Sequence, residues 1–247
     1  WLGGRESGPR DRAADVVLLA PVEPTKIVCV GLNYRDHIAE SRTAVPGGGD
    51  APAEPLLFLK PPSAVVGDGE AIRYPRGVER LDPEAELGVV IGRRARAVPV
   101  EAALDHVAGC TCFNDVSARD YQRRDGQWTR AKGFDTFAPL GPWVTVGLDP
   151  GALEVRCRVN GEERQRGRTA DLVHPVPALV SFTRAIWLHA WPASMMLPSG
   201  YIATACAKAL QPEKSATAFP SRDGPKVVSR VPSSLKRATA KTFLAPL

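Results

Sequence analysis

Short apolar runs separated by turn residues are the dominant pattern along the chain. They are bounded by Gly, Pro or charged residues, which is typical of buried strands. An Asn-Gly pair at 160–161 joins two further runs and predicts a β-hairpin. The predicted strands are 26–31 (KIVCVG), 56–60 (LLFLK), 71–74 (AIRY), 87–92 (LGVVIG), 110–115 (CTCFND), 153–159 (LEVRCRV) and 162–168 (EERQRGR).

Helical signals are fewer and shorter than strand signals. Three segments predict short helices: 33–41, 100–109 and 117–124, the last opening with a Ser cap. The Gly- and Pro-rich segment 45–55 is a loop, and no internal repeat or linker divides the chain. Many short strands with few helices predict a β-rich α+β fold and argue against a doubly wound one.

The stretch PEAELGVVIG, 83–92, places two carboxylates at the start of an apolar strand. Side chains alternate along a strand, so Glu84 and Glu86 point to the same face, about 7 Å apart. Two like charges at the edge of a core resist desolvation. A cation must lie beside them, or one of them must hold a proton.

A third carboxylate, Asp115, ends the run CTCFND. If the three strand ends meet, Glu84, Glu86 and Asp115 form an all-oxygen ligand set, which suits Mg²⁺, Mn²⁺ or Ca²⁺ better than zinc. The alternative is three solvated charges at strand edges. The depth of the apolar run that follows Glu86 favours the metal.

Two further groups can take part in chemistry. His37 and Glu40 are three residues apart, so a helix would place them on one face. A His with a carboxylate neighbour can act as a general base toward water, although the same spacing also suits a surface ion pair. Lys132, in RAKGFDTFAPLGPW, can neutralise an anionic substrate or an oxyanion.

The charge of the chain is concentrated at its C-terminal end. The formal net charge is +5, but residues 205–247 alone hold eight Lys or Arg and two acidic residues. Residues 1–204 are therefore slightly acidic, which disfavours a nucleic-acid surface. No apolar run is long enough to span a membrane. Five cysteines without metal-ligand spacing favour a reducing, cytoplasmic compartment.

Five motifs together resemble the fumarylacetoacetate hydrolase family. They are GLNYRDHIAE, LLFLKPPSAVVG, DPEAELGVVIG, FNDVSARDYQ and AKGFDTFAPLGPW, in the family's order and with roughly its spacing over residues 26–182. The resemblance implies a rolled mixed β-sheet and a homodimer that binds a divalent metal. It also implies activity on 2-oxo or 1,3-dicarbonyl acids, by C–C hydrolysis, decarboxylation or isomerisation, as in the catabolism of aromatic compounds.

The resemblance also implies a role for each matched residue. Glu84, Glu86 and Asp115 match the metal ligands, so the expected cation is Mg²⁺ or Mn²⁺. By the same match His37 is the general base and Glu40 orients it on a lid-like helix. The remaining matches are Lys132 and Thr136 beside the metal site, and Arg119 and Gln122, with Thr136, at the substrate.

The chain departs from the family after residue 204. The family continues with a loop of the form I-x-T-G-T-P-x-G-V, whereas this chain reads ACAKALQPEKSATAFPS from Ala205. With codons ending in G, reading 205–221 from the last base of the preceding codon restores IATGVREGV and then VGDGVSVE. One lost base near Thr204 would therefore explain a disordered, basic tail at 205–247. The poorly matching segment 183–200 is expected to be disturbed too.

The resemblance divides the chain into three segments: a lead-in at 1–25, a catalytic domain at 26–204 and an aberrant tail at 205–247.

Three alternatives to a metal-dependent enzyme of dicarbonyl acids remain open. Paired carboxylates with a lysine also occur in metal nucleases. A basic tail can bind nucleic acid. A family member without the substrate loop can keep its metal and lose its activity.

Overall fold

The fold is built on a seven-stranded mixed sheet. The computed structural model describes residues 17–36, 38, 51–183 and 194–198. The strand order is β2-β1-β11-β5-β6-β8-β3, and β1 with β11 and β3 with β8 are the parallel pairs. The strands are β1 (Lys26–Gly31), β2 (Leu56–Lys60), β3 (Val65–Val66), β5 (Ala85–Ile91), β6 (Val107–Asn114), β8 (Ala138–Thr145) and β11 (Ser194–Pro198).

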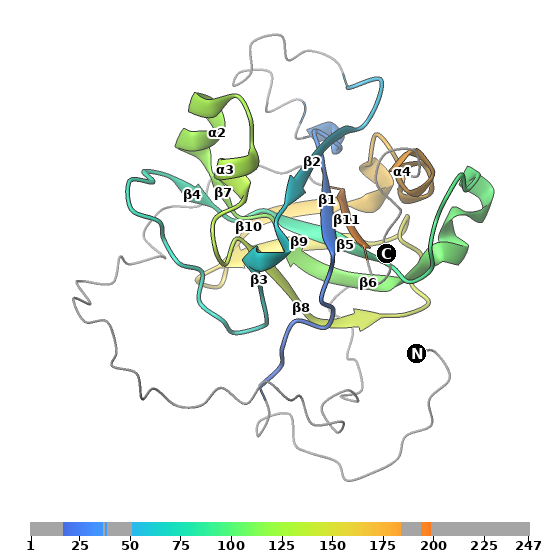
Figure 1. Cartoon of the computed structure of the whole chain (residues 1–247), viewed down its shortest axis with the longest axis horizontal. Coiled ribbons are helices and arrows are strands. Elements are labelled where there is room, and N and C mark those ends of the chain that lie inside the picture. The colour runs from blue at the N-terminus through green and yellow to red at the C-terminus, as the bar shows by residue number, and fades with distance from the viewer. Residues whose placement is uncertain (1–16, 37, 39–50, 184–193, 199–247) are drawn as a thin grey trace.

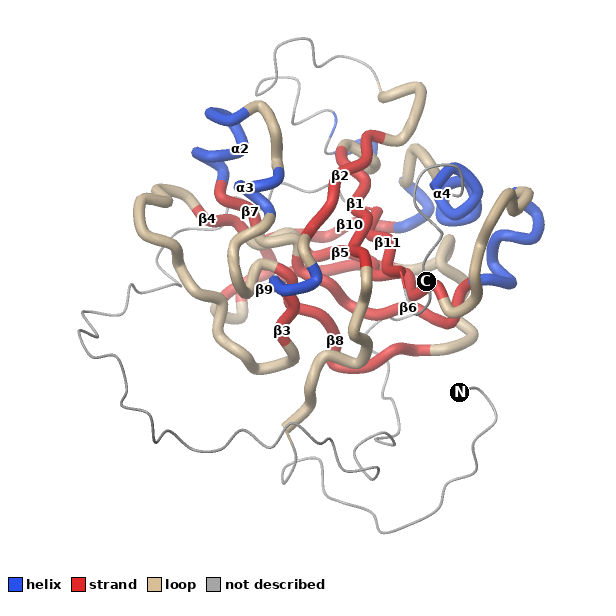
Figure 2. Tube along the Cα trace, viewed as in Figure 1, coloured by secondary structure: helices blue, strands red, loops and turns tan. Residues whose placement is uncertain are grey.

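Two small antiparallel pairs and short helices flank this sheet (Figures 1 and 2). The pairs are β4 (Leu81–Asp82) with β7 (Ser117–Ala118), and β9 (Glu154–Val159) with β10 (Glu162–Arg168). The helices are η2 (Pro62–Ala64), η3 (Val100–His106), α2 (Arg119–Asp125), α3 (Thr129–Lys132), η4 (Thr169–Asp171) and α4 (Val176–Thr183). This β-rich architecture of mixed sheets with few, short helices confirms the predicted fold class.

Strand β5 lies at the centre of the core. Its side chains from Glu86 to Ile91 are all buried, as expected of a strand covered on both faces. Leu87 and Val89 pack in one cluster with Leu179 and Val180 of α4. Because β5 is held on both faces, the carboxylates at its start are fixed relative to the core.

The pairing of β5 with β6 is antiparallel, with Ala85 opposite Asn114. The beginning of β5 therefore lies beside the end of β6. This register brings Glu84 next to Asp115, whose backbone N–H donates to the Glu84 carbonyl at 2.8 Å. The predicted meeting of the two strand ends is confirmed.

Other sequence predictions of local structure are confirmed or corrected. The Asn160-Gly161 hairpin forms, with positive φ at both residues, 54° and 84°. The predicted strand 71–74 is wrong: it is a loop, because the Arg73 backbone N–H bonds to the Thr136 hydroxyl at 2.8 Å instead of to a strand.

The predicted helices also change in extent. The segment 100–109 is a 3₁₀ helix only as far as His106, because Val107 already enters β6. The Ser cap is wrong: Ala118 is the N-cap of α2, while Ser117 pairs within β7 and its hydroxyl donates to the Asp115 carbonyl at 2.9 Å.

The ends of the chain leave several predictions untested. Of the predicted helix 33–41, the described residues 35, 36 and 38 are helical. Segment 183–200, expected to be disturbed, contains β11, which pairs between β1 and β5. The tail 205–247 and most of the lead-in lie outside the described residues. Among the helices of the described part, none is long and apolar enough to cross a membrane.

Candidate metal centre and active site

Three buried carboxylates converge where β5 begins and β6 ends. Glu86 belongs to β5, Glu84 directly precedes it, and Asp115 directly follows β6. One oxygen from each lies within 4.8 Å of the others. All three are almost fully buried, with 4%, 1% and 0% exposure for Glu84, Glu86 and Asp115. The predicted ligand set is therefore brought together in space.

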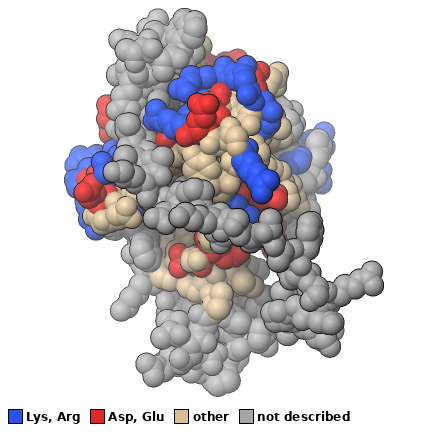
Figure 3. Space-filling model, turned by 90° about the vertical axis from the view of Figure 1, so that its left-hand side faces the viewer, with Lys and Arg blue, Asp and Glu red and all other residues tan. Residues whose placement is uncertain are grey.

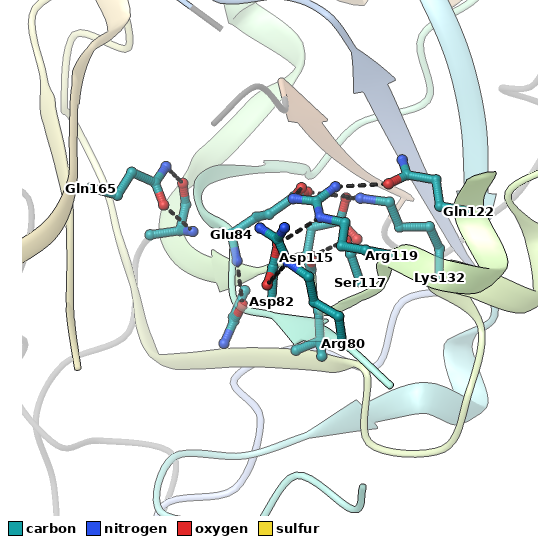
Figure 4. Close-up of polar contacts among 12 residues, drawn as sticks. Arg80, Asp82, Glu84, Asp115, Ser117, Arg119, Gln122, Lys132 and Gln165 are labelled. Carbon is teal, nitrogen blue, oxygen red and sulfur yellow. Dashed lines mark hydrogen bonds and ion pairs between the residues drawn. The ribbon is translucent and has the colours of Figure 1, made fainter. Parts of the chain in front are cut away.

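Two buried lysines neutralise part of this charge. Lys132, at the end of α3, donates to Glu84 Oε2 at 2.7 Å and to Asp115 Oδ2 at 2.6 Å (Figure 4). Lys60, at the end of β2, donates to Asp115 Oδ1 at 2.6 Å and to the Val116 carbonyl at 3.1 Å. Burial alone would lower the pKa of Lys132, but the Asp115 and Glu84 carboxylates raise it above its usual value. The Lys132 ammonium therefore stays protonated.

Glu86 differs from the other two carboxylates. Neither of its side-chain oxygens, both fully buried, has a hydrogen-bond partner in the described part of the chain. Burial raises the pKa of Glu86 well above its usual value, and the Asp115 and Glu84 charges raise it further. A buried carboxylate without donors costs several kcal/mol unless a cation or a proton balances it. The environment of Glu86 is therefore that of a metal ligand whose charge a bound cation would balance.

This environment fits a hard divalent cation. The donors are carboxylate oxygens only, which Mg²⁺ and Mn²⁺ accept and which zinc sites rarely use alone. In the described part of the cluster, Asp82, Glu84 and Asp115 each pair with a basic side chain, from Arg80, Arg119, Lys60 or Lys132. Of these four carboxylates, only Glu86 has no hydrogen-bond partner among the described residues.

Arg119 closes the other side of the carboxylate cluster. Its Nε donates to Asp82 Oδ2 at 2.9 Å, its Nη1 donates to Gln122 Oε1 at 2.8 Å, and its Nη2 donates to Glu84 Oε1. Arg80 forms a second, two-point contact with Asp82, at 3.0 and 2.9 Å. Burial would lower the pKa of Arg119, but Glu84 and Asp82 raise it. The two residues predicted to contact substrate, Arg119 and Gln122, thus lie together beside a candidate ligand.

The sequence matches a known family over most of this region. The model of the fumarylacetoacetate (FAA) hydrolase C-terminal domain matches residues 26–190. The chain belongs to the fumarylacetoacetate hydrolase family.

Relatives in this family include isomerases and hydrolases of oxo acids. The chain is 49% identical over 176 residues to protein Rv2993c of Mycobacterium tuberculosis, covering 70% of the chain and 64% of that relative. The crystal structure of 5-carboxymethyl-2-hydroxymuconate delta-isomerase from Mycobacterium smegmatis has a TM-score of 0.71, with 44% identity, 80% coverage of the chain and 76% of that structure. Maleylpyruvate hydrolase from Sphingobium sp. SYK-6, solved with manganese(II) and pyruvate, has a TM-score of 0.61 and 31% identity; the match covers 76% of the chain and 65% of that structure.

The other family positions are less closely connected to the cluster. The Thr136 hydroxyl accepts the Arg73 backbone N–H, and Thr136 has a positive φ of 68°. That contact holds a loop and includes none of the three carboxylates. His37 and Glu40 lie outside the described residues. The family's general base therefore stays a prediction.

The segment that carries His37 begins at a fixed point. Asn33, fully buried, accepts the His174 backbone N–H at 2.8 Å and donates to the His174 carbonyl at 3.1 Å. Its own carbonyl accepts the Val173 N–H at 2.8 Å. The Ile38 N–H donates to the Tyr34 carbonyl at 3.1 Å. The chain on both sides of His37 is thus placed by described residues.

Several residues of the site were missed by sequence reasoning. Asp82 lies two positions before Glu84, so strand alternation could have indicated it. Lys60 ends an apolar run, and nothing in its sequence context distinguishes it from an exposed lysine. Gln165, which bonds to the backbone between the two glutamates, comes from the distant hairpin. Only the three-dimensional structure could reveal the last two.

The face that carries α2 and α3 is rich in basic side chains (Figure 3). Arg123, Arg124 and Arg130 are exposed there, and the last two stack on the Tyr121 ring at 4.3 and 4.2 Å from its centroid. These two helices also supply Arg119, Gln122 and Lys132 to the site. The local charge therefore favours the approach of an anion.

Proposed function

We propose that this chain is a divalent-metal-dependent enzyme that acts on 2-oxo or 1,3-dicarbonyl acids. The proposed reaction is C–C hydrolysis, decarboxylation or isomerisation, and the proposed cofactor is Mg²⁺ or Mn²⁺. The observation that carries the proposal is the carboxylate of Glu86, which is buried without a hydrogen-bond partner in the described part and lies beside Glu84 and Asp115. Membership in a family of hydrolases and isomerases, one relative of which was solved with manganese and pyruvate, supports it.

The metal ligands in this proposal are Glu84, Glu86 and Asp115. A divalent cation bound there would act as a Lewis acid toward the substrate oxygens. The protein would supply the rest: Lys132, held protonated by its carboxylate neighbours, balances negative charge that develops on the substrate.

The remaining roles are assigned to groups around the ligands. Arg119 and Gln122 bind the substrate carboxylate, since a guanidinium and an amide offer planar donors at adjacent positions. Thr136 is proposed to contact the substrate as well. His37 removes a proton from water or substrate, and Glu40 orients its ring. The anchored turn at Asn33 supports this role, because it fixes where that segment starts.

The test is thermal unfolding of the chain with Mg²⁺ or Mn²⁺, with oxalate, and with metal and oxalate together. A ligand that binds only the folded state raises the unfolding temperature by mass action. We expect a rise with metal, and a further rise with oxalate only when metal is present. A cooperative transition that neither metal moves would contradict the proposed metal dependence.

The matched variants for this test are Glu86→Gln and Glu101→Gln. Glu101 is exposed in η3, so its substitution makes the same chemical change away from the carboxylate cluster. The metal-induced rise should vanish in Glu86→Gln and persist in Glu101→Gln. Equal rises in both variants would show that metal binds elsewhere.

A cytoplasmic homodimer completes the proposal. The four cysteines of the described part are free thiols, which supports a reducing compartment. Light scattering during size-exclusion chromatography tests the dimer, and a monomer mass would contradict it. Resequencing the gene tests the lost base that we propose near Thr204.

A further inference from the structure

Gln165 contacts the backbone between the two glutamates through both ends of its side-chain amide. Its Oε1 accepts the Ala85 N–H at 2.8 Å, and its Nε2 donates to the Ala85 carbonyl at 2.7 Å (Figure 4). The side chain is only 5% exposed. It comes from β10, which belongs to a different sheet from β5. One side chain thus satisfies both polar groups of one residue.

The contact lies where the described strands leave one edge of β5 without a partner. Strand β6 pairs with β5 along one edge from Ala85 to Ile91, whereas the described residues of β11 pair with the other edge at Val89, Val90 and Ile91. In an antiparallel ladder, a residue that faces a partner exchanges both its N–H and its C=O with that partner. At Ala85 the Gln165 amide takes the place that a strand would fill.

This contact holds the backbone between the two candidate ligands. Glu84 is held on the β6 side, where its N–H donates to Asn114 Oδ1 at 3.0 Å and its carbonyl accepts the Asp115 N–H at 2.8 Å. Glu86 has no hydrogen bond to orient its carboxylate in the described structure. Its direction is therefore set by the backbone of β5, which pairs with β6 at Glu86 and is held by Gln165 at Ala85, because adjacent residues of a strand rotate together.

We propose that Gln165 is a positioning residue for the metal ligands Glu84 and Glu86. This inference rests on the proposed function, since it assigns a metal to those carboxylates. Groups that orient metal ligands usually change metal affinity about 10- to 100-fold when they are replaced. Gln165 acts on the ligand backbone instead of on a ligand atom, and it links the hairpin β9–β10 to the strength of metal binding.

The decisive comparison is Gln165→Met against Thr169→Val. Methionine keeps the length of the side chain but removes both hydrogen bonds to Ala85. Thr169 offers a matched control, because its Oγ1 also bridges one residue, accepting the Leu153 N–H at 2.9 Å and donating to the Leu153 carbonyl at 3.2 Å. Thr169 is equally buried, at 2% exposure, and Leu153 is not a candidate ligand.

The measurements are the Mn²⁺ dissociation constant and the spectrum of bound Mn²⁺ by electron paramagnetic resonance, on the full chain below its unfolding temperature. We expect both variants to unfold at lower temperature than the wild type. Only Gln165→Met should weaken Mn²⁺ about 10-fold or more and change the spectrum. Gln165→Asn, whose amide is one methylene too short, should weaken Mn²⁺ similarly and serves if the Met variant does not fold.

The possible results separate the inference from the function on which it rests. If the wild type binds Mn²⁺ and the Gln165 variants bind it equally well, Gln165 is only structural and the inference is wrong. If Thr169→Val weakens Mn²⁺ as much as Gln165→Met, the effect is a general loss of stability, and the inference is again wrong. If the wild type itself binds no Mn²⁺, the proposed function fails first.

Discussion

Replacing Glu86 with leucine should stabilise the metal-free protein. Leucine has no polar atoms, so the variant removes a buried carboxylate whose two oxygens have no partner in the described structure. It leaves Lys132, Lys60 and Arg119 with the same hydrogen-bonded carboxylates as before. Glu84→Leu is the matched contrast, two residues away on the same strand face. It removes one carboxylate partner from each of Lys132 and Arg119, which keep Asp115 and Asp82.

The size of each effect follows from these partners. An unsatisfied buried polar group costs about 1–3 kcal/mol, so Glu86→Leu should raise the free energy of unfolding by about that amount without metal. Removing one partner of a buried ion pair costs about 3–5 kcal/mol, so Glu84→Leu should lower it. For a chain of this size, 1 kcal/mol moves the unfolding temperature by about 2–4 °C. Substitution by leucine should thus raise the free energy of unfolding at Glu86 and lower it at Glu84.

The assay is thermal unfolding in EDTA and again in excess Mg²⁺. At a metal concentration of about 100 times the dissociation constant, the wild type should gain about 2.7 kcal/mol, and neither variant should gain it. The order of wild type and Glu86→Leu should therefore reverse, or nearly do so, between the two buffers. A loss of stability in Glu86→Leu in EDTA, as large as in Glu84→Leu, would refute the reasoning, because it would mean that Glu86 has a strong partner.

Three further predictions concern other parts of the chain. His37→Ala should lower turnover about 100-fold and leave the Mn²⁺ dissociation constant unchanged, and equal turnover would remove His37 from the mechanism. Lys60→Met should lower the free energy of unfolding by about 3–5 kcal/mol in urea titrations, because it leaves Asp115 Oδ1 and the Val116 carbonyl without their donor; a change below about 1 kcal/mol would show that Lys132 alone suffices. Burial raises the pKa of the Cys110 thiol to about 12 from its usual 9.0, so folding favours the neutral thiol. That stability is fully present below pH 9 and is lost as pH rises toward 12. The free energy of unfolding of the wild type should therefore fall relative to that of Cys110→Ala in that window. A difference between the two proteins that stays constant from pH 8 to 11 would contradict the burial.

Strand positions were predicted well where apolar runs were long or ended in a strong turn. The hairpin at Asn160-Gly161 formed because that pair adopts positive φ at low cost. The prediction of a strand at 71–74 was wrong, because four residues of alternating character do not show whether a neighbouring strand is available to pair with them. Helix ends failed similarly: Ser117 looked like a cap, but its hydroxyl is used by the Asp115 carbonyl.

The carboxylates of the site could be predicted from the sequence, but their partners could not. Alternation places Glu84 and Glu86 on one face once the segment is a strand, and the burial of the following run requires a counter-charge. Which cation supplies that charge depends on contacts between residues far apart in the chain. Lys60 reaches Asp115 across 55 positions, and Gln165 reaches Ala85 across 80. No local pattern carries this information.

The charges of the described site favour joint binding of metal and substrate. Four buried carboxylates, those of Asp82, Glu84, Glu86 and Asp115, face the buried cations of Lys60, Lys132 and Arg119 and the partly exposed cation of Arg80. The formal charges of these described groups balance without metal, and a divalent cation would add two positive charges. An anionic substrate would then offset them in a site where uncompensated charge is costly. The same argument opposes substrate binding without metal, because the anion would then bring a negative charge that no cation of the site is left to balance. Metal should therefore bind first or together with substrate, and oxalate should stabilise the fold only after metal is added.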